Sequence, residues 1–271
     1  EPAIELEEMV VETPTFSWQD YIDTRVFHLL MTIFFYEGNI QEAFEFARQE
    51  GVKPFDLLVR MQSMLGEAPA AFRHVIAEFL EESEKELFSS REACHAWAVE
   101  HMDQLINGSL GGNLLSKYSM LGRFYATREG LDFLEVTIKS ALADRLVEER
   151  EQELTTVMNY LRCVLLQTPF AKAMKEAPLW VTSFDVESWR DGAYSRPLES
   201  YRFEEPRTYA TAVELQKQAV ILSRIATFGE NPSGLGKFTR TMFAQDLRRM
   251  LVPLELGMPM KAERFRIAAA G

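Results

Sequence analysis

Residues 10–36, VVETPTFSWQDYIDTRVFHLLMTIFFY, contain a strand-like run, a proline and the start of a strongly apolar segment. Pro14 fixes its own backbone torsion and favours an extended conformation at Thr13, so the extended run cannot pass directly into a helix. Ser17 can cap the free amides of a first helical turn, and Asp20 places a negative charge near the positive end of the helix dipole. The stretch therefore predicts a helix that begins just after Ser17.

The predicted helix carries apolar side chains around most of its circumference. They recur at helical spacing, and aromatic residues widen the apolar stripe; they are Tyr21, Ile22, Val26, Phe27, Leu29, Leu30, Met31, Ile33, Phe34 and Phe35. A helix covered on most sides is expected to lie in the middle of the fold. Its apolar run is too short to cross a bilayer, which takes about 20 residues, so we predict no membrane span.

The same stretch resembles a segment just after the catalytic core of radical S-adenosylmethionine (SAM) proteins that also carry an N-terminal cobalamin-binding domain. The matching residues are Glu8, Val11, Thr13, Thr15, Ser17, Asp20, Tyr21 and Arg25. A weaker similarity is the segment 184–189, FDVESW, which resembles a strand-like part further along the same C-terminal regions. The resemblance implies a parent enzyme that binds an iron–sulfur [4Fe–4S] cluster, SAM and cobalamin.

The chain departs from that family where these groups would bind. It has only Cys94 and Cys163, and it contains neither a Cys-x-x-x-Cys-x-x-Cys motif nor an Asp-x-His-x-x-Gly motif. We therefore expect a C-terminal fragment that begins abruptly at Glu1, with residues 1–16 as a linker or strand remnant of a preceding domain. Such a fragment should bind no cofactor itself, and its partners would be the upstream radical SAM barrel and cobalamin-binding domains of the same parent chain.

Composition narrows the class of protein further. The 271 residues are 47% hydrophobic and 26% charged, which is typical of a soluble globular chain. A formal net charge of −12 argues against a nucleic-acid binder, because affinity for phosphates depends on clustered Lys and Arg. Basic residues gather only near the C-terminus, where a solvated helix face or a docking surface for an acidic partner would explain them. Two cysteines suit a reducing compartment, so we expect a cytoplasmic protein.

Periodicity and turn residues predict a mainly α fold, an array of antiparallel helices with a small β-hairpin in the C-terminal third. Helices are expected at 17–36, 40–49, 54–65, 70–88, 90–106, 114–126, 131–143, 209–228 and 237–251, and strands at 179–186 and 201–204. The helix at 131–143 is expected to continue through the charged block 148–151 to residue 166. We divide the chain into a helical subdomain 17–106, a hinge loop 107–113, and a helical subdomain 114–271 with short β segments near 179–205.

Candidate chemical groups are few. Glu92 and His95 form a Glu-x-x-His pair of the kind that di-iron bundles use, but that site needs a second such pair and two more glutamates, which are not evident. His28 lies within the apolar helix and is interpreted as a core histidine, with a ligand-facing position as the alternative. Gly229 and Gly234 have P-loop spacing, but Leu235 stands where Lys is required, which favours a helix end followed by a turn. We assign no catalytic, cofactor-binding or metal-binding residue.

Three functions are compatible with this sequence. The first is a substrate-recognition or lid domain of a cobalamin-dependent radical SAM enzyme, possessing no catalytic activity in isolation. The second is a freestanding helical protein–protein interaction module, and the third is an independent enzyme with a di-iron or other metal site. An accessory domain should expose an apolar patch near residues 13–25, where the barrel would pack, and its aromatic residues are candidates to line a pocket for an apolar small molecule.

Overall fold

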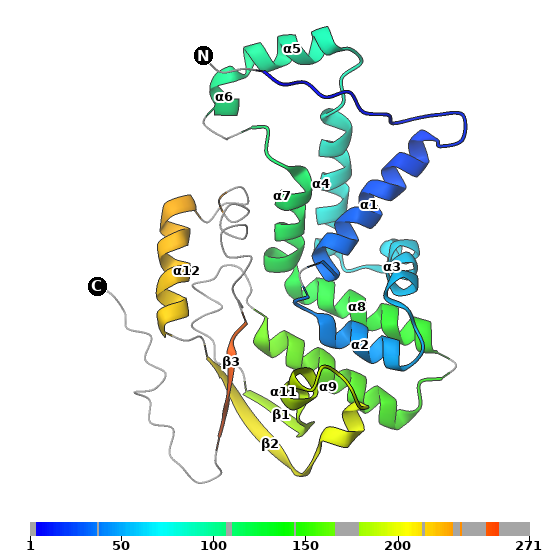
Figure 1. Cartoon of the computed structure of the whole chain (residues 1–271), viewed down its shortest axis with the longest axis vertical. Coiled ribbons are helices and arrows are strands. Elements are labelled where there is room, and N and C mark those ends of the chain that lie inside the picture. The colour runs from blue at the N-terminus through cyan, green and yellow to red at the C-terminus, as the bar shows by residue number, and fades with distance from the viewer. Residues whose placement is uncertain are drawn as a thin grey trace.

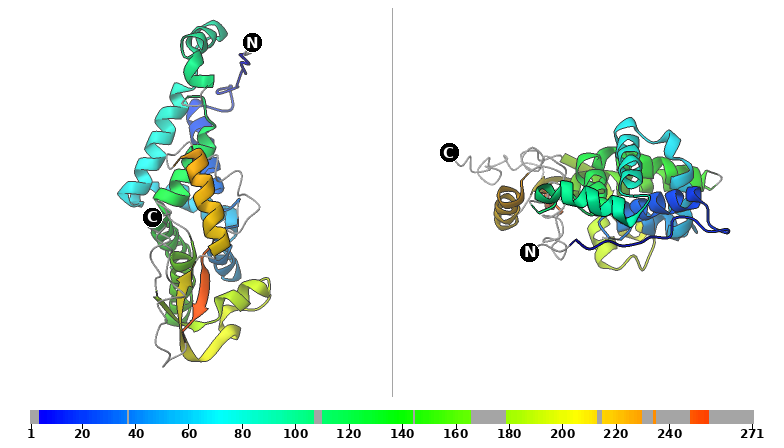
Figure 2. Two further views of the ribbon diagram at one scale, coloured as in Figure 1. Left: turned by 90° about the vertical axis from the view of Figure 1, so that its left-hand side faces the viewer. Right: turned by 90° about the horizontal axis from the view of Figure 1, so that it is seen from above.

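The computed structural model describes residues 4–36, 38–106, 110–143, 145–165, 179–212, 215–229, 234 and 248–254. The fold is mainly helical with a small antiparallel sheet in the C-terminal third, as predicted (Figure 1). The molecule is elongated in Figure 1 and in the left view of Figure 2, with helices α5 and α6 at one end and the sheet at the other.

From α1 to α9, the described helices follow one another along the chain without an intervening strand. They are α1 Trp18–Phe34, α2 Gln41–Gln49, α3 Pro54–Ser63, α4 Ala70–Lys85, α5 Arg91–Glu100, α6 Met102–Ile106, α7 Leu114–Met120, α8 Thr127–Leu142, α9 Glu148–Val164, α11 Val186–Asp191 and α12 Leu215–Phe228. Single turns of 3-10 helix lie at η1 Leu65–Glu67 and η3 Leu198–Tyr201, and a π-helical turn η2 spans Leu121–Tyr125. None of the described helices has both the length and the apolar character needed to traverse a lipid bilayer.

Helix α1 is expected in the middle of the fold, but it is buried on one side only and leaves His28 exposed on the other. It packs against α3, α4 and α7, and Leu29 and Leu30 are completely buried. One hydrophobic core continues from α1–α4 through α7–α9 to the sheet, so helices on both sides of segment 107–113 share it. Gly122 in η2 permits the closest approach to α1, since a Cβ there would lie 2.6 Å from Cδ1 of Ile33.

The sheet contains β1 Leu179–Phe184, β2 Arg202–Ala212 and β3 Met250–Pro253 in the order β1-β2-β3, with both pairs antiparallel. Side chains of β1 alternate between solvent and the interior, and Trp180 packs between Tyr160 of α9 and Tyr209 of β2. The predicted pairing of the first two strands is confirmed, with α11 and η3 inserted between them.

Several predicted helix boundaries are wrong. The helix predicted to run from 131 to 166 is broken, because α8 ends at Leu142 and Val147 takes an extended conformation before α9. The charged block 148–151 is therefore the first turn of a helix, where its glutamates are favoured by the helix dipole. The helix predicted for 90–106 is interrupted at His101, which ends α5.

Strand pairing overrides helical periodicity at two further places. The helix predicted from 209 starts only at Leu215, because residues 209–212 pair with β3. The helix predicted for 237–251 lies mostly outside the described residues, and its last two residues belong to β3. Residues 107–109 of the predicted hinge 107–113 lie outside the described residues.

Candidate functional site

The stretch that carries the family resemblance forms the entry to α1. Ser17 and Asp20 make a reciprocal capping box: the Ser17 amide donates to Oδ2 of Asp20 at 2.8 Å, and the Asp20 amide donates to Oγ of Ser17 at 3.2 Å. The bond from the Ser17 amide lowers the pKa of the Asp20 carboxyl. Thr13 and Phe16 close a tight turn through two backbone bonds just before the cap. These residues therefore fix where α1 begins and in which direction it leaves.

Arg25 connects α1 to the end of α4. Its Nη2 atom donates to Oγ of Ser83 at 2.9 Å and to Oε2 of Glu86 at 3.4 Å, and its guanidinium lies over the ring of Phe79. Burial raises the pKa of Glu86, and the positive charge of Arg25 opposes that rise. Tyr21 is buried beside the helix start. Arg25 therefore connects two helices, and Tyr21 contributes to the core.

Helices α1 and α3 expose apolar side chains where they meet; we call Phe27, Phe55 and Val59 the α1–α3 surface, and Phe35 and Tyr36 are also exposed just after α1. Phe55 is 63% exposed and Tyr36 is 61% exposed, while Phe27 is half-buried against Phe55 with ring centroids 5.3 Å apart. Exposed aromatic side chains that cluster in this way are typical of a surface that another protein covers.

This surface only partly matches the predicted patch. Between residues 13 and 25, no large apolar side chain of the described chain is exposed, whereas Met9 and Val10 upstream and the α1–α3 surface downstream are. Exposed apolar side chains therefore flank the predicted patch on both sides and do not fill it. Phe55 and Val59 have the helical spacing of the apolar residues of α3, and they are exposed because α3 buries Leu57, Leu58 and Met61 instead.

An open groove of about 550 Å³ lies beside Val59, between α3 and α8. Its lining includes Asp56, Arg60 and Glu67, and Arg60 Nε donates to Oγ of Ser140 across it at 3.1 Å. The lining is mostly polar and the groove is open to solvent. It therefore lacks the enclosed apolar wall that an apolar small molecule would need.

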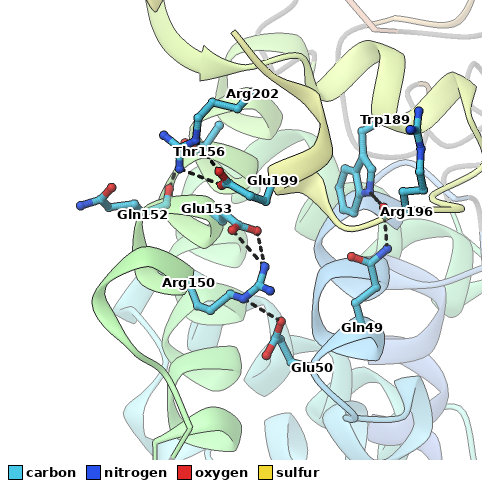
Figure 3. A network of polar contacts seen from close by, with 10 residues as sticks. All are labelled: Gln49, Glu50, Arg150, Gln152, Glu153, Thr156, Trp189, Arg196, Glu199 and Arg202. Carbon is cyan, nitrogen blue, oxygen red and sulfur yellow. Dashed lines mark hydrogen bonds and ion pairs between the residues drawn. The ribbon is translucent and has the colours of Figure 1, made fainter. Parts of the chain in front are cut away.

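Charged side chains join α9 to the end of α2, and a separate charged pair lies beside them at the start of β2 (Figure 3). Nη1 of Arg150 donates to both carboxylate oxygens of Glu153, at 2.9 and 2.8 Å, and Nε of Arg150 lies 3.5 Å from Oε1 of Glu50. Glu153 is almost fully buried, so burial raises its pKa, and Arg150 opposes that rise. Glu199 and Arg202 form a further two-bonded pair next to it.

Polar contacts also fasten the turn after α11 to the end of α2. Nε2 of Gln49 donates to the backbone oxygens of Tyr194 at 3.0 Å and Arg196 at 3.3 Å, and Nε1 of Trp189 donates to the same Arg196 oxygen (Figure 3). Trp189 is completely buried, so its indole N–H needs this partner. These hydrogen bonds therefore hold the segment between β1 and β2 against α2.

A buried ion pair lies between α2 and the residues before β3. Glu42 of α2 is completely buried, and Arg248 donates to its two oxygens at 2.5 and 3.0 Å and also to the backbone oxygen of Asn39. Nearby, Nη1 of Arg190 donates to the hydroxyl of Tyr160 at 3.0 Å. Burial raises the pKa of the Tyr160 phenol, so it stays neutral at physiological pH. The contacts present here tie α2, α9, α11 and the strand β3 together.

The histidines and cysteines occupy separate places. His28 was interpreted as a core histidine, which is wrong: it is exposed on the side of α1 that no described helix covers, with its ring 6.4 Å from that of Tyr36. Glu92 and His95 are both exposed on α5. Cys94 lies on α5 and Cys163 on α9, both as free thiols.

The described residues form no metal-binding site, and most of the loop with P-loop spacing is not described. Within those ranges, no three His, Cys, Asp or Glu side chains come together in a way that could hold a metal ion. Gly229 follows the end of α12 with φ +85°, which agrees with a helix end at that glycine. Residues 230–233 between the two glycines, and residues 235–247 after them, lie outside the described residues.

Sequence reasoning missed the α1–α3 surface and the buried Glu42–Arg248 pair. Periodicity assigns Phe55 to the core, and the two charged residues are separated by 206 positions, so no local signal connects them. Comparisons of the chain with protein-family models, with curated proteins and with solved structures return no match. The family resemblance therefore rests on the matching residues alone.

Proposed function

We propose that this chain is a helical accessory domain of a cobalamin-dependent radical SAM enzyme and serves in substrate recognition or as a lid. The observation that carries the proposal is the junction at residues 8–25. The residues that resemble the family include those that build the turn, the cap and the anchor of α1, namely Thr13, Ser17, Asp20 and Arg25. The proposal is supported by the position of these matching residues, which together set where α1 begins and how it is anchored.

Exposed apolar side chains on both sides of the junction support docking against another domain. Met9 and Val10 precede it on an extended segment and are 55% and 72% exposed, and the α1–α3 surface follows it. We propose that a radical SAM barrel of the same parent chain covers these side chains. An interface of this kind would bury aromatic residues at its centre, as interfaces between proteins commonly do.

The residues described here do not fit the parent's cofactors. A [4Fe–4S] cluster needs thiolate ligands, and the two cysteines lie on different helices, α5 and α9. No described group of side chains suits a metal ion. We therefore assign cluster, SAM and cobalamin to the upstream domains of the proposed parent and no catalytic step to this chain. Free thiols agree with a reducing compartment, and we propose the cytoplasm.

The first test is the coding sequence upstream of Glu1. An in-frame Cys-x-x-x-Cys-x-x-Cys motif preceded by a cobalamin-binding domain would support the proposal. A start codon that directly precedes this chain would refute it. In that case the α1–α3 surface would favour the second function, a freestanding interaction module, because it is exposed without any upstream domain.

The second test uses the full-length parent protein and measures protease sensitivity in the segment before α1. Phe55→Ser with Val59→Ser should increase cleavage in residues 4–16, because weaker docking exposes the segment. Val147→Ser is the matched control, since Val147 is 56% exposed but lies in the turn between α8 and α9. Equal cleavage of all three proteins would show that the α1–α3 surface is not the docking site.

A further inference from the structure

Negative charge is concentrated at one end of the molecule. Residues 4–25 and 78–106 carry fourteen carboxylates against three Lys or Arg side chains, a formal charge of −11 out of −12 for the whole chain. These residues form the extended N-terminal segment, the start of α1, the end of α4, and helices α5 and α6, which occupy the upper part of Figure 1. We call this region the acidic end.

Ion pairs neutralise only part of this charge. Glu81 pairs with Lys85 at 2.5 Å, Glu82 with Lys117 at 2.6 Å and Glu86 with Arg25 at 3.4 Å. The other carboxylates of α4 to α6 are exposed or half-buried on the helix surfaces; they are Glu78, which lies 3.5 Å from Nε2 of His74, and Glu84, Glu92, Glu100 and Asp103. A broad field of one sign therefore faces solvent, and such a field steers oppositely charged partners toward it.

Apolar side chains are exposed within the same field. Helix α5 buries only Ala98 and α6 buries no residue, so both helices project from the core with little cover. Val99 is 53% exposed and Ile106 is 64% exposed. An acidic surface that also presents apolar side chains is complementary to a segment that combines basic and apolar residues.

We propose that the acidic end is a docking surface for a basic amphipathic helix of a partner protein. Nucleic acids and anionic lipid surfaces carry the same sign of charge and would be repelled. The carboxylates are spread along α4, α5 and α6, and within the described residues they make no cluster able to hold a metal ion. A basic helix fits both features, since its charged face meets the carboxylates while its apolar face covers Val99 and Ile106. The acidic end has this capacity whether or not the chain belongs to a radical SAM enzyme.

The experiment measures binding of a fluorescently labelled amphipathic helical peptide made of Lys and Leu by fluorescence anisotropy. Two controls accompany it: a peptide of the same composition with its Leu residues scrambled off one face, and a Glu–Leu peptide. The unaltered chain should bind the Lys–Leu peptide, bind the scrambled peptide at least about fivefold more weakly and not bind the Glu–Leu peptide. Raising salt from about 50 mM to about 300 mM should weaken binding, because exposed charges are screened beyond a Debye length of about 10 Å or less.

Charge reversal locates the surface. Glu84→Lys with Glu100→Lys changes the acidic end near two helix C-termini, where lysine is favoured by the helix dipole, so the fold should persist. Glu204→Lys with Glu205→Lys makes the same change in net charge on the exposed part of β2. The first variant should bind at least about tenfold more weakly, because it changes the charge of the acidic end by four units. The second should bind within about twofold of the unaltered chain. A tenfold loss of affinity corresponds to about 1.4 kcal/mol, spread over those four units of charge.

An apolar variant separates docking from simple attraction between charges. Val99→Ser with Ile106→Ser keeps every charge and should still weaken binding of the Lys–Leu peptide by about fivefold. Equal losses for the two charge-reversal variants would overturn the proposal, because net charge alone would then explain binding. So would equal affinity for the scrambled peptide, or a Val99 and Ile106 variant that binds as the unaltered chain does.

Discussion

Replacing Glu42 with Ala should lower the free energy of unfolding by about 3 kcal/mol. The Glu42 side chain is completely buried and the Arg248 side chain is 10% exposed, so the substitution leaves a guanidinium inside the protein without its carboxylate. Removing one partner of a buried pair costs about 3–5 kcal/mol. Arg248 also donates to the backbone oxygen of Asn39, which places the expected cost at the lower end of that range.

Urea denaturation followed by circular dichroism measures this loss. For a chain of this size the slope of stability against urea is about 3 kcal/mol per molar, so the midpoint should fall by about 1 M. Glu199→Ala is the control, because the Glu199 side chain is 50% exposed and its partner Arg202 is 40% exposed. An exposed pair contributes about 0–1 kcal/mol, so the control midpoint should move by about 0.3 M or less.

A double substitution tests whether the loss comes from the stranded charge. Glu42→Leu with Arg248→Met replaces both partners with apolar side chains, and stability should recover to within about 1 kcal/mol of the original protein. Equal midpoints for Glu42→Ala and Glu199→Ala would refute the reasoning. A double variant no more stable than Glu42→Ala would also refute it, because packing or local strain would then be the cause.

Three further predictions concern the helix start, the closest helix contact and the thiols. Ser17→Ala should lower the free energy of unfolding by about 1 kcal/mol through loss of the cap, measured by urea denaturation. Gly122→Ala should cost about 1–3 kcal/mol in the same assay, because its Cβ would meet Cδ1 of Ile33 at 2.6 Å; Ile33→Val removes that atom and should recover part of the loss. Cys94 should react with a thiol reagent in the folded protein, whereas Cys163 should react mainly after unfolding, since burial covers its thiol and raises its pKa.

Local rules predicted the entry to α1 well because every determinant lies within a few residues. Pro14, Ser17 and Asp20 act on their own neighbours; Ser17 caps the helix as predicted, and Asp20 completes a capping box that was not predicted. The same is true of Gly51, which ends α2 with φ +83°, a conformation that few other residues adopt. Fold class followed from such signals, since helix starts, helix ends and apolar periodicity repeat along the chain.

Features that depend on distant contacts could not be read from the sequence. Phe55 has the periodicity of a core residue, yet α3 turns Leu57, Leu58 and Met61 inward. The strand at 209–212 looks helical in isolation and becomes a strand because β3 pairs with it. Sequence periodicity cannot predict such features, because each depends on a partner many residues away. Contacts with that partner outweigh the local propensity of the segment.

The two proposed docking surfaces would be held by different forces, which makes them separable by salt. Contacts at the α1–α3 surface would be mainly apolar and aromatic, so their strength should change little with ionic strength. Contacts at the acidic end would depend on exposed carboxylates and should weaken steeply as salt rises. A partner that stays bound at about 300 mM salt and is lost in Phe55→Ser belongs to the α1–α3 surface, whereas one released by salt and by Glu84→Lys with Glu100→Lys belongs to the acidic end.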